Sequence, residues 1–188
     1  SFLSKKCDHI VKVYDDFGEE DDMGFFYVME LLSGKSLRDF LRHHGYLSFS
    51  VALHLFGQIC EAIHLAHQHD ILHRDLKPEN IFLIQRPEDP LFVKVIDFGI
   101  SRFLHDANTQ LTRGVVGTPV YMAPEQFGST ESSPRTDLYA LALIFYEMLT
   151  GAVPFVLPDD SPVAIGMKRL TEPPPPLSTP YPSLQIPP

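Results

Sequence analysis

An eight-residue stretch, His73 to Asn80, constrains this chain more than any other part of its sequence. It follows a helical pattern of apolar residues and precedes the strand-like run Ile81 to Ile84. The stretch offers a carboxylate, an ammonium group and a carboxamide, on Asp75, Lys77 and Asn80. A carboxylate can orient and deprotonate a hydroxyl, an ammonium group can neutralise a phosphate, and an amide oxygen can hold Mg²⁺. These are the side chains that phosphoryl transfer needs.

The sequence around this stretch predicts two groups of strands. Residues 9–14 and Phe25 to Leu32 suit strands, and the acidic residues Asp15 to Asp22 between them suit a solvated hairpin turn. After the central stretch, Ile81 to Ile84 and Phe92 to Ile96 read as a short antiparallel pair.

Helix signals mark four segments. Ser36 precedes a short helix over residues 37–43, and Ser48 is a plausible N-cap for a longer one. A third helix, Thr136 to Thr150, is apolar nearly all round, which predicts burial on every side. A short fourth helix is expected over Val163 to Leu170.

Composition narrows the class of partner. The chain carries 24 acidic and 15 basic residues, a net charge of -9, whereas proteins that bind nucleic acid or membrane surfaces cluster Lys and Arg. We therefore expect no nucleic-acid partner and no membrane contact from this segment.

The longest apolar run, Leu138 to Leu149, is too short to cross a bilayer. Two cysteines, Cys7 and Cys60, favour a reducing compartment.

A group of histidines raises an alternative from another class of protein. His64, His67 and His69 lie close together near the end of the longer helix and could suggest a metal site. No cysteine or acidic cluster accompanies them to complete a tetrahedral site. We therefore favour a polar helix face with one packed histidine, and a zinc titration would distinguish the two interpretations.

Two further motifs follow the central stretch in a fixed order, Asp97-Phe98-Gly99 and Ala123-Pro124-Glu125. Together the three motifs closely resemble those of the protein kinase family. Their sequences are similar to those of bacterial receptor-type Ser/Thr kinases. The resemblance covers about Cys7 to Leu177 and implies a two-lobed α+β fold with a truncated small β lobe and a mainly helical large lobe. It divides this one partial kinase domain into a small-lobe remnant (1–29), a hinge (30–36), a large lobe (37–172) and a Pro-rich loop or linker (173–188).

The resemblance assigns catalytic roles, which are carried over from this well-studied family. Asp75 matches the base that accepts the proton of the substrate hydroxyl, and Lys77 would steady the γ-phosphate of ATP. Asn80 and Asp97 match the ligands of Mg²⁺, with Mn²⁺ as an alternative. Asp137 resembles a buried aspartate that fixes the backbone of the catalytic loop.

The same resemblance outlines a nucleotide site. Met29 would sit behind adenine, and the backbone of Glu30 and Leu32 would hydrogen-bond its edge. Phe82 matches the apolar floor under adenine, although Met29 and Phe82 would be equally at home in a core. Four polar residues would complete the ATP site: Lys77, Glu79, Asn80 and Asp97.

The acceptor is expected to be Ser or Thr in a protein substrate. Lys77 in the central stretch resembles the Ser/Thr kinase pattern, whereas tyrosine kinases have a different pattern there, with Ala or Arg nearby. The segment Gly117-Thr118 with Tyr121 is similar to the Ser/Thr kinase substrate platform, in which Thr118 would contact Asp75 and Lys77.

Regulation by phosphorylation is a further implication. Arg74 precedes Asp75, and a phosphate on the following polar loop would pair with that guanidinium and order the loop. Thr112 is the first candidate for the phosphorylated residue and Thr109 the second. A solvent-facing loop residue is an equally good interpretation of each threonine.

Some family features do not occur in this sequence. We find no Gly-x-Gly-x-x-Gly phosphate loop and no third-strand lysine in a Val-Ala-Ile-Lys context, since Lys5 and Lys6 lie too late. The late helices that would bring an arginine to Glu125 are also not found. The sequence is therefore expected to be the middle section of a kinase domain, placed in the cytoplasm or on the cytoplasmic side of a membrane-anchored parent.

Two explanations stay open. The chain is part of a complete enzyme, or it is a kinase-like binding or scaffold module without transfer activity. Drift without catalytic demand would be expected to damage at least one member of the catalytic set. All four members are present, which favours the enzyme: Asp75, Lys77, Asn80 and Asp97.

Overall fold

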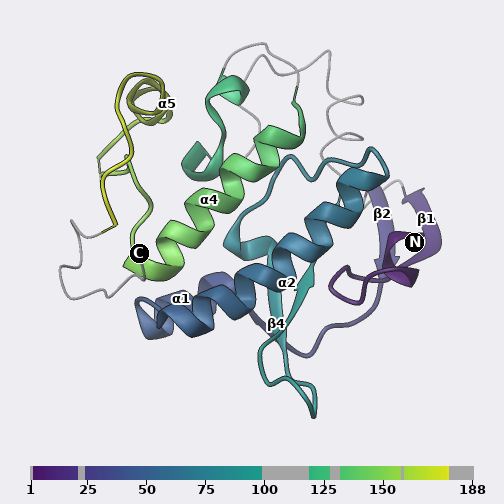
Figure 1. Cartoon of the computed structure of the whole chain (residues 1–188). Helices are drawn as coiled ribbons and strands as arrows, with labels where there is room; N and C mark the ends of the chain where they lie inside the picture. The colour runs from purple at the N-terminus through teal and green to yellow at the C-terminus, as the bar shows by residue number, and fades with distance from the viewer. Residues whose placement is uncertain (1, 21–23, 99–118, 128–131, 158, 178–188) are drawn as a thin grey trace.

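The structure is a computed structural model that describes residues 2–20, 24–98, 119–127, 132–157 and 159–177. Its helices are α1 (Leu37–His44), α2 (Phe49–Gln68), α4 (Pro134–Thr150) and α5 (Pro162–Thr171). Its strands are β1 (Val13–Glu20), β2 (Gly24–Met29), β3 (Gly34–Ser36), β4 (Ile81–Ile84) and β5 (Phe92–Val95). Single 3₁₀ turns are η1 (Leu3–Lys5), η2 (Pro78–Asn80), η3 (Pro119–Tyr121) and η4 (Pro124–Phe127). In Figure 1, β1 and β2 lie at the right, and α1, α4 and α5 lie to the left of them.

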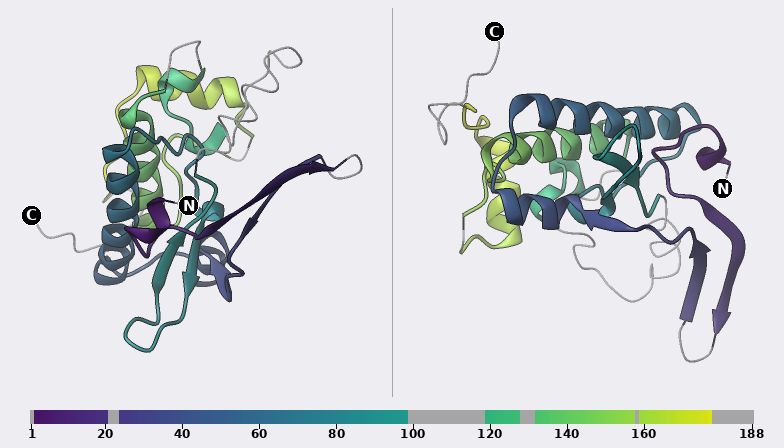
Figure 2. Two further views of the ribbon diagram at one scale, coloured as in Figure 1. Left: turned by 90° about the vertical axis from the view of Figure 1, so that its right-hand side faces the viewer. Right: turned by 90° about the horizontal axis from the view of Figure 1, so that it is seen from below.

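The strands form two separate antiparallel sheets. Strands β1 and β2 pair as a hairpin that stands out from the rest of the molecule (Figure 2). Strands β3, β4 and β5 form the second sheet, in which Ile81 lies opposite Val95. A single parallel bridge between Ile10 and Val95 ties the segment before β1 to the second sheet. The chain therefore enters the hairpin beside β5, at one edge of the second sheet, and leaves it through β3 at the other edge.

Helices α2 and α4 lie side by side and form the core. Leu55, Ile59 and Ile63 of α2 are no more than 1% exposed, and so are Ile144 and Met148 of α4. Burying each of these side chains stabilises the fold by about 2 kcal/mol relative to leaving it in water. By length and composition alone α2 could cross a membrane. Its packing within the core accounts for its apolar residues.

The helix starts agree with the serine signals in the sequence. The Ser36 hydroxyl accepts from the Asp39 N–H at 3.1 Å, and the Ser48 hydroxyl accepts from the Val51 N–H at 3.4 Å. These bonds satisfy N–H groups that would otherwise lack a partner in the first turn. The end of α2 is followed by Asp70 in the left-handed region, with φ 58°. A glycine would adopt that backbone conformation more easily.

Three sequence-based expectations were wrong in detail. The acidic residues 15–20 belong to β1 rather than to a turn, because backbone pairing with β2 continues as far as Glu20 opposite Gly24. The strand predicted to reach Leu32 ends at Met29. Helix α4 is not buried on every side, since Leu138 is 54% exposed. Ala142, one turn further on, is exposed on the same face.

Candidate active site

The central stretch folds as a loop that leads into η2, and it brings its polar side chains together. The Lys77 ammonium donates to the Asp75 carboxylate at 2.6 Å. The Asn80 amide nitrogen donates to the Asp75 backbone carbonyl at 2.9 Å. The Asp75 side chain is 32% exposed and that of Lys77 20%. Both groups are therefore close to each other and open to a molecule in solution.

The second sheet brings Asp97 to the same place. Ile81 and Val95 are paired in β4 and β5, and the Ile96 N–H donates to the Asn80 carbonyl at 2.9 Å. Asn80 therefore precedes β4 at the same end of the hairpin where Asp97 follows β5. Asp97 has φ 64°, so its backbone turns sharply out of the sheet direction.

The side chain of His73, the first residue of this loop, is completely buried beneath the loop backbone. Its Nε2–H donates to the Ile96 carbonyl at 2.9 Å, and its ring lies 4.9 Å from that of Phe98. Burial lowers the pKa of His73, although the carboxylates of Asp137, Asp75 and Asp97 act in the opposite direction. A neutral imidazole therefore supports the loop from below.

A tyrosine that sequence analysis did not single out reaches Asp97. The hydroxyl of Tyr27, in β2, donates to the Asp97 carboxylate. Burial raises the pKa of Tyr27, and the hydrogen bond and charge of Asp97 raise it further. The apolar run around Tyr27 predicted only a strand, so its spacing carried no signal of this contact.

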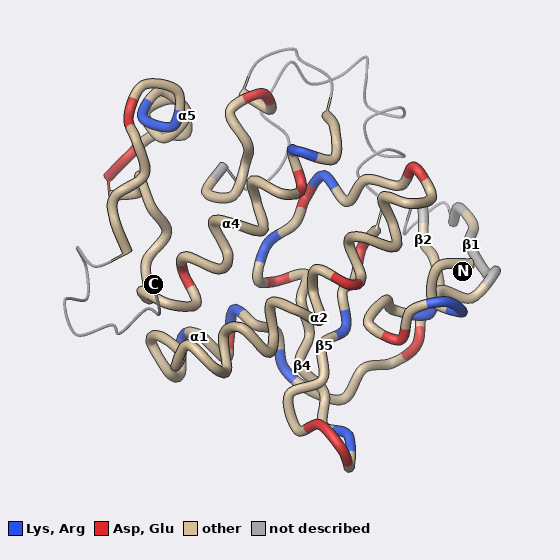
Figure 3. Tube along the Cα trace, viewed as in Figure 1, with Lys and Arg blue, Asp and Glu red and all other residues tan. Residues whose placement is uncertain are grey.

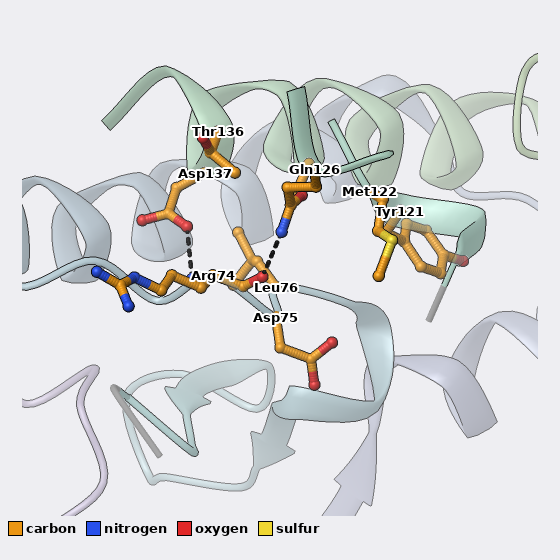
Figure 4. A pocket seen from close by; sticks show the side chains of 9 residues that line it. Arg74, Asp75, Leu76, Tyr121, Met122, Gln126, Thr136 and Asp137 are labelled. Carbon is orange, nitrogen blue, oxygen red and sulfur yellow. Dashed lines mark hydrogen bonds between the residues drawn. The ribbon is translucent and has the colours of Figure 1, made fainter. Parts of the chain in front are cut away.

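Asp137 holds the loop backbone, as the resemblance implied. Its carboxylate is 1% exposed and accepts from the His73 N–H at 2.9 Å and the Arg74 N–H at 2.8 Å. His67 Nε2 lies 2.7 Å from the same carboxylate. Arg74 has φ 67°, a conformation that these bonds maintain. Figure 4 shows Asp137 above the loop and the Asp75 side chain pointing away from it.

The histidine cluster is divided among separate partners. His67 contacts Asp137, while His64 contacts Gln68 at 3.0 Å and His69 contacts Lys6 at 3.3 Å. The part of the chain that the structure describes contains no group of three His, Cys, Asp or Glu side chains arranged for a metal ion. The zinc-protein alternative therefore has no geometric support there, and His67 acts as a packed histidine.

The loop is also joined to the segment that follows residue 118. The Gln126 amide donates to the Arg74 carbonyl at 2.9 Å and accepts from the Ala123 N–H at 2.8 Å. Arg74 and Gln126 border a small pocket beside Asp137 (Figure 4). Glu125 accepts from the Thr136 hydroxyl at 2.7 Å.

Arg38 of α1 links four parts of the fold, and sequence analysis did not identify it. It donates to Glu79 of η2 at 2.8 Å, to Glu147 of α4 at 2.6 Å and to the hydroxyl of Tyr121. Tyr121 in turn donates to Glu147 at 2.6 Å. Burial would lower the pKa of Arg38, but the hydrogen bonds to Glu79 and Glu147 outweigh burial and raise it. In Figure 3, α1 carries both basic and acidic residues, and α4 carries acidic residues.

Residues 29–32 cross from the hairpin to β3. The Glu30 carboxylate accepts from Lys94 Nζ at 2.7 Å and from the Lys12 N–H at 2.8 Å. Burial raises the pKa of Glu30, but these two bonds outweigh it and lower the pKa. Met29 is 39% exposed and Leu31 99%. The side chain of Glu30 thus joins this segment to Lys94 of β5 and to the Lys12 backbone.

Four of the residues singled out in the sequence lie outside the described residues: Gly99, Thr109, Thr112 and Thr118. Phe82 lies in β4 and is partly exposed.

The structure combines a strand hairpin with a helical body that carries the loop of Asp75, Lys77 and Asn80. The family model described as "Protein kinase domain" matches residues 2–173 of the chain. The chain belongs to the protein kinase family. This confirms the predicted family and the α+β class.

Several curated relatives are bacterial serine/threonine-protein kinases. The chain is 40% identical to the serine/threonine-protein kinase pkn3 of Myxococcus xanthus over 175 residues, which is 91% of this chain and 32% of the relative. It is 39% identical to PknB of Mycolicibacterium smegmatis, over 90% of this chain and 27% of the relative. It is 38% identical to PrkC of Bacillus subtilis, over 89% of this chain and 25% of the relative. The chain thus spans about a quarter to a third of the length of these relatives.

Proposed function

We propose that this chain provides the catalytic loop and substrate-binding part of a serine/threonine protein kinase, which transfers the γ-phosphoryl group of ATP to Ser or Thr hydroxyls of proteins. One observation carries the proposal. Asp75, Lys77 and Asn80 are joined by hydrogen bonds at the end of the β4–β5 hairpin where Asp97 also lies. The names of the bacterial relatives support the choice of Ser and Thr as acceptors.

Each side chain has a role that its geometry permits. The partly exposed Asp75 carboxylate would accept a hydrogen bond from the substrate hydroxyl, aim its oxygen at the phosphorus atom and take its proton. Lys77, 2.6 Å from Asp75, would balance the charge that develops on the transferred phosphoryl group. Asp137 and His73 would act only by holding the loop in place.

Magnesium fits the available donor set. Asn80 uses its amide nitrogen toward Asp75, which leaves its amide oxygen as a ligand, and Asp97 offers a carboxylate. Hard oxygen donors of this kind suit Mg²⁺ and also Mn²⁺. When bound, the ion would be held by Asn80 and Asp97, and it would neutralise negative charge on the phosphates of ATP.

The nucleotide and protein substrates would approach from different sides. Adenine would lie against the segment 29–32 and Phe82, with the Glu30 side chain fixed by Lys94. The protein substrate would lie on the surface around Thr118 and Tyr121. Phosphorylation at Thr112 or Thr109 would be sensed by Arg74. A cytoplasmic site of action follows from the need for ATP and agrees with the two free cysteines.

A binding or scaffold module is the second candidate. The specific observation in its favour is that this sequence contains no Gly-x-Gly-x-x-Gly loop and no lysine in the Val-Ala-Ile-Lys context. A module without transfer activity would have no need of the complete set Asp75, Lys77, Asn80 and Asp97, so the enzyme is the better account.

The substitution Asp75→Asn tests the proposed function in the full-length protein. The amide cannot take the proton of the hydroxyl, so kcat for phosphorylation of a Ser/Thr substrate should fall by about 100-fold or more. Radiolabel transfer from γ-labelled ATP measures the rate, and a thermal melt by circular dichroism checks that the fold is unchanged. Wild-type turnover in this variant would remove Asp75 from its role.

A further inference from the structure

Helix α5 contains a buried arginine, Arg169, that lies outside the catalytic loop. Arg169 is 7% exposed, although arginine is normally found at the surface. Its guanidinium donates to the backbone carbonyl of Met122 at 2.6 Å and to that of Val120. Burial lowers the pKa of Arg169. The two carbonyls offset part of the cost of keeping the charge inside.

The two carbonyls flank Tyr121, and this determines what Arg169 can do. A guanidinium is planar and holds its N–H groups in a fixed fork. Two carbonyls that bind one fork must keep a fixed distance and direction relative to each other. Arg169 therefore sets the backbone conformation of residues 120–122.

The phenol side chain of Tyr121 is held by residues other than Arg169. Its hydroxyl contacts Arg38 and donates to Glu147 at 2.6 Å. Arg38 also binds Glu79, which precedes Asn80 in the catalytic loop. The segment is thus fixed through its side chain by α1 and α4, and through its backbone by α5.

Helix α5 is close enough to act as a rigid support. It packs against η3 and η4, at the upper left in Figure 1. A Cβ atom added at Gly166 would lie 2.9 Å from the Phe127 ring, so this approach requires the absence of a side chain. Arg169, one turn after Gly166, is therefore presented to η3 from a helix that packs closely against η4.

We propose that Arg169 is a positioning residue for the protein substrate. It holds Val120 to Met122 so that the surface around Tyr121 is ready for the segment that carries the acceptor hydroxyl to Asp75. The inference rests on the proposed kinase function. The hydrogen bonds of Arg169 within the described residues go to Val120 and Met122, which belong neither to the catalytic loop nor to residues 29–32. Its removal should therefore weaken the use of protein substrate and leave the use of ATP unchanged.

The test compares Arg169→Met with Arg169→Lys in the full-length protein. Arg169→Met removes both hydrogen bonds to the carbonyls and should raise KM for a Ser/Thr peptide about tenfold. Arg169→Lys keeps a point charge that satisfies one carbonyl well, and it should raise KM about threefold. KM for ATP and the rate of ATP hydrolysis without peptide should stay within about twofold in both.

Lys168→Met is the matched control. Lys168 precedes Arg169 on the same helix, and its ammonium group pairs with Asp160 at 2.6 Å. This variant should behave as wild type. The inference is overturned if Arg169→Met leaves the peptide KM unchanged. It is also overturned if peptide transfer and peptide-free ATP hydrolysis fall by the same factor, because that result indicates general damage to the fold.

Hydrogen exchange separates this inference from the proposed function. A wild-type protein that phosphorylates no Ser or Thr substrate would contradict the proposed function. Amide exchange over residues 119–127 would still report on Arg169. Faster exchange there in Arg169→Met than in Lys168→Met, with α2 unchanged, supports the positioning role, and equal exchange in the two variants contradicts it.

Discussion

At the scale of single residues, the buried His73 under the catalytic loop makes stability depend on pH. Burial lowers its pKa below the ordinary 6.5, so the folded protein keeps this ring neutral. The unfolded chain takes up a proton near that pH. Below pH 6.5 the unfolded state therefore binds more protons than the folded state, and the free energy of unfolding falls as the pH drops.

The substitution His73→Gln should reduce this pH dependence. A glutamine amide can still donate to the Ile96 carbonyl but does not titrate. A group that must lose its proton on folding contributes up to about 1.4 kcal/mol per pH unit. Urea unfolding at pH 7.5 and 5.5 should show a smaller drop in stability for His73→Gln than for wild type. The exposed His43→Gln serves as control, and an unchanged drop in His73→Gln would contradict the account.

The sequence predicted some of the site and missed the rest for a physical reason. Asp75, Lys77 and Asn80 are neighbours in the chain, so their spacing alone indicated a shared site. The bond between Arg38 and Glu147 joins residues 109 positions apart. That between Tyr27 and Asp97 spans 70. Such contacts depend on how whole elements pack, which spacing within one segment does not reveal.

At the scale of elements, α2 offers a direct test of its place in the core. Leu55 is 0% exposed and Leu53, on the same helix, is 50% exposed. Leu55→Ala should lower the free energy of unfolding by about 2–4 kcal/mol, because it leaves a cavity between packed side chains. Leu53→Ala should cost less than about 1 kcal/mol. Urea unfolding of both variants measures the difference, and equal costs would mean that α2 does not pack as described.

Helices were predicted better than strands because their signals are local. A capping serine and apolar residues at helical spacing lie within one segment, so α1, α2, α4 and α5 were expected within a few residues of their observed bounds. The extent of β1 depends on its partner strand. Its acidic residues resembled a turn, yet pairing with β2 gives their backbone groups a ladder of hydrogen bonds.

At the scale of the whole molecule, the 188-residue chain should be a poor catalyst by itself. The family's phosphate loop and strand lysine, which position the phosphates of ATP, do not occur in it. Without that positioning, transfer to a Ser/Thr peptide should be at least about 100-fold slower than for the full-length protein. Steady-state transfer from γ-labelled ATP measures both rates. Robust transfer by the 188 residues that Asp75→Asn abolishes would contradict this expectation.

The hairpin and the catalytic loop have different supports. Among the described residues, β2 and its end reach the body through Tyr27 and Glu30, whereas the loop is fastened to α4 through Asp137. Under the proposed function, a displacement of the hairpin by a nucleotide would break the contacts of Tyr27 and Glu30 and leave the bonds of Asp137 to the loop intact. Asp75 would then keep its orientation while the hairpin moves.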